Sequence, residues 1–279
     1  MTDIAVEAHG LGKQYRKIWA LKDCAFSLPA NRVVALVGAN GAGKSTLMNI
    51  AAGLLAATQG EIRVNGRCVL LAQDKPLYRN FSVADMLVFG RHMNKEWDRQ
   101  RALKWLDAFD IPLERPCGKL SGGQQTQVAL AVALGARPSV LLLDEPLANL
   151  DPLARREVTG ELLAEVAESD MTVILSTHVV AELAGVGDYL LLLGKGRSQL
   201  EGDVEELISQ HTRLIGPRSD APPVDGTVVQ AVHNERQSTF LMRTLLGCDT
   251  PLAPPWQAQP VSLEELVLVY LKRKKGEEL

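Results

Sequence analysis

A glycine-rich stretch near the N-terminus constrains the fold of this chain more than any other feature. It reads Gly38-Ala-Asn-Gly-Ala-Gly43-Lys44-Ser45-Thr46 and matches the phosphate-binding P-loop pattern G-x-x-x-x-G-K-[ST]. The apolar run at 33–37 predicts a buried parallel strand, and residues 46–53 predict a helix. Strand, glycine loop and helix in this order are the context that a phosphate-binding loop requires, and they disfavour the alternative of a glycine turn without function.

The chemistry expected of this loop follows from its residue types. Glycines let the backbone turn tightly and bring its N–H groups against phosphate oxygens, and the helix N-terminus adds partial positive charge. Lys44 is expected to reach the β- and γ-phosphates, and the Ser45 hydroxyl is expected to ligate Mg²⁺. The residues expected to surround the phosphates are Gly38, Asn40, Gly41, Ala42, Gly43, Lys44, Ser45 and Thr46.

Composition and charge narrow the classes of protein to which the chain can belong. The formal net charge of −3 over 279 residues gives no sign of a general nucleic-acid binder. The 4 cysteines are scattered and form neither a metal pattern nor a disulfide framework, which favours a reduced cytosolic location. The N-terminus lacks the basic start and apolar core of a signal peptide. No apolar run approaches the roughly 18 residues of a membrane-spanning helix, so we expect any membrane contact to be made through a partner.

Several polar residues follow predicted buried strands. The strand at 139–143 ends in Asp144-Glu145, where open α/β sheets bind ligands. Asp144 suits the Mg²⁺ shell and Glu145 suits polarising a water, although a solvated acidic strand end is the plainer alternative. His178 follows the strand at 171–175 and Gln73 follows the strand at 68–72. Taken alone, each of these two residues is more often structural, but His178 shares the sheet edge with the acids.

A second helix start of the anion-binding type lies far from the first. Leu120-Ser121-Gly122-Gly123-Gln124 precedes the apolar helical run at 128–134, so a serine and two glycines stand where helix N–H groups are unpaired. The chain therefore has two phosphate-type helix starts but one P-loop. Tyr15, in a polar stretch upstream of the P-loop, offers a ring that could stack on a base, although an exposed tyrosine is usually plain surface.

The element order predicts two parts. Residues 1–205 are expected to form an α/β domain with a mostly parallel sheet and an inserted helical piece at about 80–135. Residues 206–279 are expected to be a small extension. In it we predict a short helix at 203–210, a proline-containing linker at 215–225, a strand pair at 226–243 and a last helix capped by Ser262. The basic residues at the end of that helix, 272–275, either interact favourably with the helix dipole or contact an anionic membrane surface.

Taken together, these motifs resemble the ATP-binding subunits of ABC transporters. The P-loop, the signature at 120–124, the Walker B strand ending in Asp144-Glu145, the D-loop at 148–151 and His178 fall in family order across roughly residues 4 to 200. The resemblance implies an ABC ATPase fold: a P-loop NTPase with a RecA-like core, an antiparallel β subdomain and an inserted helical subdomain. It implies ATP and Mg²⁺ as cofactors and ATP hydrolysis coupled to transport.

The resemblance also implies residue roles. Tyr15 would stack on adenine, and Glu145 would orient or deprotonate the attacking water. Gln73 and His178 would sense the γ-phosphate, and Ser45, Gln73 and Asp144 would lie near Mg²⁺. In the family two ATPase subunits pack head to tail, so Ser121, Gly122, Gly123 and Gln124 would serve the ATP of the partner, with Asp151 in the D-loop.

Partners follow from the same resemblance. With one P-loop, the chain would pair with a second copy or a related subunit, and a separate integral membrane permease would hold it on the inner face of the cell membrane; no nucleic acid is expected. The tail at 262–271 resembles that of bacterial ABC-2-type exporter ATPases, although import ATPases share every core motif. A soluble ABC-type ATPase acting on ribosomes is the alternative, but such chains usually carry two ATPase domains. Gln127 and Val132 stand where the family usually or often has arginine.

Overall fold

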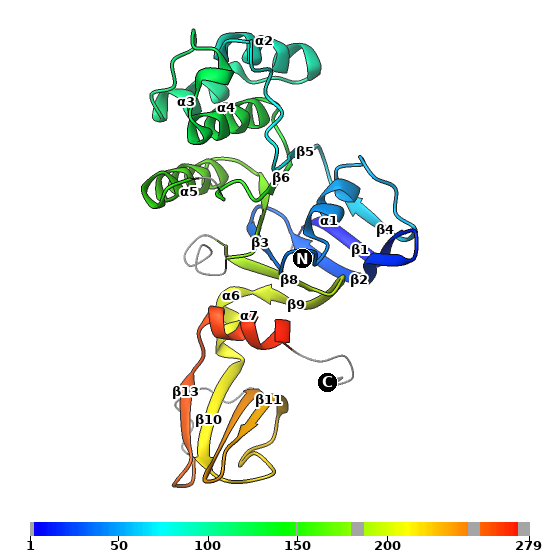
Figure 1. The fold of residues 1–279 in the computed structure, drawn as a ribbon, viewed down its shortest axis with the longest axis vertical. Coiled ribbons are helices and arrows are strands. Elements are labelled where there is room, and N and C mark those ends of the chain that lie inside the picture. The colour runs from blue at the N-terminus through cyan, green and yellow to red at the C-terminus, as the bar shows by residue number, and fades with distance from the viewer. Residues whose placement is uncertain (1–2, 149, 180–186, 245–251, 273–279) are drawn as a thin grey trace.

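A computed structural model describes residues 3–148, 150–179, 187–244 and 252–272, and Figure 1 shows their arrangement. A helical group lies at one end of the long axis, the sheets that carry the P-loop lie in the middle, and a separate sheet lies at the other end. The described residues contain no helix that is both long and apolar enough to cross a membrane.

The central sheet has six strands in the order β5-β6-β7-β3-β8-β9. Its strands are β3 (Val33–Val37), β5 (Cys68–Leu71), β6 (Val140–Asp144), β7 (Thr172–Thr177), β8 (Tyr189–Gly194) and β9 (Arg197–Asp203). Neighbours are parallel except for β9, which pairs antiparallel with β8. Every residue of β3, β6 and β7 is buried because both faces of the sheet are covered. The predicted mostly parallel sheet is confirmed.

A three-stranded antiparallel sheet packs over the P-loop helix α1 (Lys44–Ala51). Its order is β2-β1-β4, with bounds β1 (Ile4–Tyr15), β2 (Ile18–Pro29) and β4 (Gln59–Val64). Side chains of β1, β2 and α1 share one apolar core with the alternate face of β3, β6 and β8. This sheet is the antiparallel subdomain that the family resemblance implied.

The inserted helical piece contains α2 (Val83–Met93), α3 (Arg99–Ala108), the 3₁₀ turn η1 (Cys117–Lys119) and α4 (Gly122–Gly135). Ser82 begins α2 with a capping box, because its hydroxyl accepts from the Asp85 amide and the Asp85 carboxylate accepts from the Ser82 amide. The helices stand together above the sheet in Figure 1. The inserted helical subdomain is thus confirmed.

Polar contacts fasten α3 on two sides. The Trp105 indole nitrogen donates to the buried Gln127 amide oxygen on α4 at 3.0 Å. On the other side Arg101 pairs with Glu165 of α5 (Pro152–Ala167), and Lys104 pairs with Glu168 at 2.6 Å. The helical piece is therefore tied to the core through α5 as well as through the chain connections.

The C-terminal residues form a third sheet with the strand order β11-β12-β10-β13. Its elements are α6 (Val204–Ser209), β10 (His211–Pro217), β11 (Thr227–His233), β12 (Gln237–Arg243), β13 (Gln257–Pro260) and α7 (Leu263–Lys272). The predicted short helix, strand pair and Ser262-capped helix are confirmed, since the Ser262 hydroxyl accepts from the Glu265 amide. The predicted linker is wrong at its start, where Ile215, Gly216 and Pro217 complete β10. A proline is tolerated there because it ends the strand.

Helix α7 holds this third sheet against the central one. It contacts β8 and β9 on one side and β11 on the other. Buried His211, the first residue of β10, contacts the Leu207 carbonyl of α6 at 2.6 Å through Nδ1. Its Nε2 lies 3.0 Å from the Tyr270 hydroxyl of α7. Burial lowers the pKa of His211, and the nearby Arg243 charge lowers it further.

Candidate functional site

The P-loop lies where the sequence predicts it, between β3 and α1. Gly43 has a φ of 106°, in the left-handed region. A Cβ on Gly43 would lie 2.6 Å from Leu21 Cδ2 and 2.7 Å from the Ala20 carbonyl oxygen. Only glycine permits both this backbone shape and this approach to β2.

Lys44 is nearly buried and already oriented. Its side chain is 6% exposed, and its Nζ donates to the Gly38 carbonyl at 2.7 Å. The same nitrogen lies 3.7 Å from Glu145 Oε1. Burial lowers the pKa of Lys44, while the charges of Glu145 and Asp144 act in the opposite direction. The ammonium is thus held at the mouth of the loop beside a carboxylate.

An open pocket of about 410 Å³ is lined by several of the predicted residues, although Asp144 and His178 are not among them. Most of the P-loop lines it, and Gln73 and Glu145 reach it from β5 and β6; the lining residues are Ala20, Asn40, Gly41, Gly43, Lys44, Ser45, Thr46, Gln73 and Glu145. Among the described residues no group of three His, Cys, Asp or Glu side chains could hold a metal by itself. The Ser45 hydroxyl, the Gln73 amide and the Asp144 carboxylate supply hard oxygens, which suit a Mg²⁺ held jointly with substrate phosphates.

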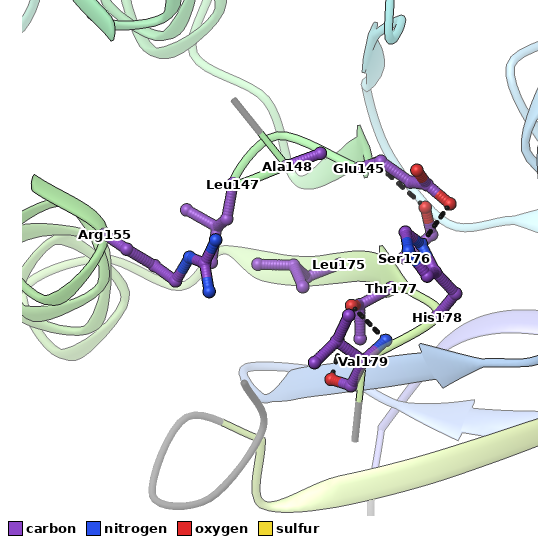
Figure 2. Close-up of a pocket in the computed structure, with 9 residues that line it drawn as sticks. All are labelled: Glu145, Leu147, Ala148, Arg155, Leu175, Ser176, Thr177, His178 and Val179. Carbon is purple, nitrogen blue, oxygen red and sulfur yellow. Dashed lines mark hydrogen bonds and ion pairs between the residues drawn. The ribbon is translucent and has the colours of Figure 1, made fainter. Parts of the chain in front are cut away.

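The two adjacent acids at the end of β6 have different surroundings. Asp144 ends the strand, is 6% exposed and accepts at Oδ1 from the Ser176 hydroxyl at 2.7 Å. Glu145 follows with a φ of 48°, and its amide donates to the same Ser176 oxygen at 2.9 Å. Figure 2 shows the Glu145 carboxylate turned toward His178, whose Nδ1 lies 3.1 Å from Oε1. The structure thus gathers Glu145, His178 and Lys44, and it places His178 beside Glu145 at the sheet edge that the sequence predicts for both.

A smaller pocket of about 170 Å³ continues behind Glu145. Arg155 from α5 and Thr177 from β7 also line it, as Figure 2 shows. Arg155 donates to the Leu150 carbonyl at 3.3 Å, and the Thr177 hydroxyl accepts from the Val179 amide at 3.0 Å. The sequence interpretation missed Ser176, Thr177 and Arg155. The signal for Ser176 was its place near the end of β7, but its pairing with Asp144 depends on the strand order.

The signature residues begin α4 and do not line the P-loop pocket. The Ser121 hydroxyl accepts from the Gln124 amide at 3.2 Å, and the Gln124 side chain accepts from the Ser121 amide at 3.2 Å. Neither these residues nor the following glycines line the pocket at Lys44. Nothing lies within 4 Å of a Cβ built on Gly122, so packing inside this chain does not require glycine there.

The two remaining predicted site residues are both at the surface. Tyr15 is 48% exposed and does not line the P-loop pocket. Lys13 Nζ lies over its ring, 5.4 Å from the ring centroid. Asp151 begins α5, where its Oδ1 accepts from the Leu153 and Ala154 amides, both at 3.0 Å. Asn149 of the predicted D-loop lies outside the described residues. The nucleotide roles of Tyr15 and Asp151 stay predictions.

The family model "ABC transporter" matches residues 21–148. The chain is 34% identical to the molybdenum import ATP-binding protein ModC of Mycobacterium tuberculosis, over 74% of this chain and 63% of ModC. It is 35% identical to the Fe(3+) ions import ATP-binding protein FbpC of Pseudomonas fluorescens, over 75% of this chain and 64% of FbpC. The chain thus spans less than two thirds of the length of these relatives.

Solved structures agree with the fold. One described as the ATP-binding subunit of an ABC transporter superposes with a TM-score of 0.66 at 24% identity, covering 73% of this chain and 91% of its own. The structure of cbiO1 from Clostridium perfringens gives 0.64 at 29% identity, covering 74% and 90%. The ABC ATPase fold class is confirmed.

The expectation of an ABC-2-type exporter finds no support among these relatives, because ModC and FbpC are both named for import. Its physical basis was weak, since the core motifs serve both directions and the tail at 262–271 lies outside the residues that the family model matches.

Proposed function

The chain carries an ABC transporter ATP-binding domain, and from that premise we propose that it is the ATP-hydrolysing subunit of a membrane transporter. A separate permease would carry the cargo and hold this chain at the inner face of the membrane. The reaction is attack of water on the γ-phosphate of ATP, giving ADP and phosphate.

The placement of Glu145 carries this proposal. Its carboxylate lies at the open pocket, 3.7 Å from Lys44 Nζ and 3.1 Å from His178 Nδ1. In this role Glu145 orients the attacking water and accepts its proton, and His178 holds the carboxylate in position. Lys44 and the P-loop amides bind the phosphates and stabilise the charge that develops on them. Bound Mg²⁺ would neutralise phosphate charge, held by Ser45, Gln73 and Asp144.

The signature helix supports a site shared between two chains. Ser121 and Gly122 present an exposed helix N-terminus that the P-loop pocket of the same chain does not use. A phosphate bound at the P-loop of one chain would satisfy these groups across an interface. ATP then joins two copies of this chain, or this chain and a related subunit, and hydrolysis releases them.

The direction we propose is import, because the relatives described above are import ATPases. The alternative of a soluble ribosome-acting ATPase has no specific observation in its favour. Purification of the tagged chain from its native membranes tests both. A polytopic permease in near one-to-one ratio supports the transporter, and an accompanying extracytoplasmic binding protein supports import. Ribosomal proteins in its place would overturn the proposal.

The chemical step is tested with Glu145→Gln. We expect this variant to bind ATP, to lose turnover by about a hundredfold or more, and to accumulate as an ATP-bound dimer. His178→Ala serves as a comparison that leaves the carboxylate in place but removes its contact. Hydrolysis by Glu145→Gln at the normal rate would show that another group is the base.

A further inference from the structure

One buried hydroxyl connects the two acids of the site. Ser176 on β7 is 0% exposed, and its Oγ donates to Asp144 Oδ1 at 2.7 Å. The same oxygen accepts from the Glu145 amide at 2.9 Å (Figure 2). We propose that Ser176 is a positioning residue of the ATPase site, through which one hydroxyl sets both the Asp144 carboxylate and the Glu145 backbone. This inference rests on the proposed function.

The bond to Asp144 fixes the rotation of a buried carboxylate. The hydroxyl occupies Oδ1, so Oδ2 is the oxygen that would remain for a bound Mg²⁺ or its water. Asp144 and Ser176 are paired in register on the adjacent parallel strands β6 and β7. The hydroxyl is therefore held by the sheet itself, and it orients the carboxylate before any ligand arrives.

The bond to Glu145 stabilises an unusual backbone shape. With a φ of 48°, Glu145 lies in the left-handed region that non-glycine residues rarely adopt. This turn directs the carboxylate back toward Lys44 and His178. In this turned shape the Glu145 amide donates to the Ser176 oxygen. Loss of the hydroxyl would leave the amide without that acceptor and allow the carboxylate to move off the attacking water.

A purely structural hydroxyl on the same strand provides the matched control. Thr172 begins β7, is 1% exposed and accepts from the Asn31 amide at 2.9 Å. It lies at the opposite end of the strand from the two acids. Thr172→Val removes a buried, hydrogen-bonded hydroxyl from β7 without touching the site, so it reports the general cost of such a loss.

The experiment compares Ser176→Ala, Ser176→Thr and Thr172→Val in the full chain. For Ser176→Ala we expect kcat to fall about tenfold to a hundredfold, since small misplacements of a catalytic group cost this much. The Mg²⁺ concentration for half-maximal ATP binding should rise severalfold, while metal-free binding of a fluorescent ATP analogue stays unchanged. Exchange of the Glu145 amide hydrogen should accelerate. Ser176→Thr keeps a hydroxyl and should restore these values, and Thr172→Val should lower only the melting temperature.

Specific results would overturn the inference. One is a Ser176→Ala variant whose kcat, Mg²⁺ dependence and Glu145 amide exchange are all unchanged. The other is a Thr172→Val variant that changes these three quantities as much as Ser176→Ala does. If Ser176→Ala does not fold, Ser176→Cys replaces it, because a thiol has similar volume but bonds weakly. If the wild-type chain itself does not hydrolyse ATP, the proposed function fails, and the amide-exchange arm still shows separately whether the hydroxyl holds Glu145.

Discussion

Trp105 donates its indole hydrogen bond to Gln127 inside the helical subdomain, at 3.0 Å and with both residues buried. Gln127 occupies the position at which the resemblance to ABC ATPases implied an arginine. An arginine has five donors and no acceptor, so it could not receive the indole N–H. The departure from the family pattern is therefore matched by a tryptophan on the neighbouring helix, and the pair fixes α3 on α4.

We expect Gln127→Arg to destabilise the chain by about 1–3 kcal/mol, because two buried donors would then face each other. Urea unfolding measures the loss. Trp105→Phe combined with Gln127→Leu is the control, since removing both partners should cost less than the sum of the single losses. Strict additivity would mean that the hydrogen bond does not couple the two helices.

Arg101→Met should cost about 3 kcal/mol, because it leaves the largely buried Glu165 carboxylate without its cation. Lys104→Met is the matched control on the same helix. Both partners of the Lys104–Glu168 pair are more than 60% exposed, so solvent screens the pair and its loss should cost far less than the loss of the Arg101 pair. Equal losses for the two variants would show that burial does not distinguish these pairs.

Ser121→Arg should leave ATP binding by the single chain intact and prevent the ATP-dependent dimer, because the added side chain fills the exposed helix start. Ser82→Arg is a control for lost capping, since Ser82 makes the same box on α2. Each variant should lose about 1 kcal/mol of stability, but only Ser121→Arg should abolish dimers in light scattering. Loss of ATP binding by the single chain would contradict the shared site.

Stability should fall on acidification through His211. Its pKa is lowered in the folded chain, so below its usual value near 6.5 the unfolded chain binds more protons. The contribution is therefore complete above about pH 6.5 and is lost as the pH falls toward the folded pKa, with a slope of up to about 1.4 kcal/mol per pH unit. His211→Gln should flatten this slope in denaturation curves between pH 7.5 and 5. An unchanged slope would assign the pH dependence to other groups.

The sequence predicted features that depend on short stretches. The P-loop with its strand and helix, the Ser262 cap of the last helix and the acids at the end of β6 depend on residues close together in the chain. The C-terminal sheet was predicted only in part, because Pro217 was interpreted as a linker residue although it closes β10. Ser176 was missed because its contact with Asp144 needs the order of strands from distant parts of the chain.

The place of β3 in the central sheet has a consequence for synthesis. Its two neighbours are made much later, because β7 begins about 135 residues and β8 about 150 residues after β3 ends. At ~5–20 residues per second these delays last about 7–30 s. During that interval Val33–Val37, an entirely apolar strand, has no partner on either edge. The nascent chain therefore carries a strand that is entirely buried in the finished fold without its neighbours until residues near 194 leave the ribosome. This makes the elongating chain, more than the finished protein, the species at risk of aggregation.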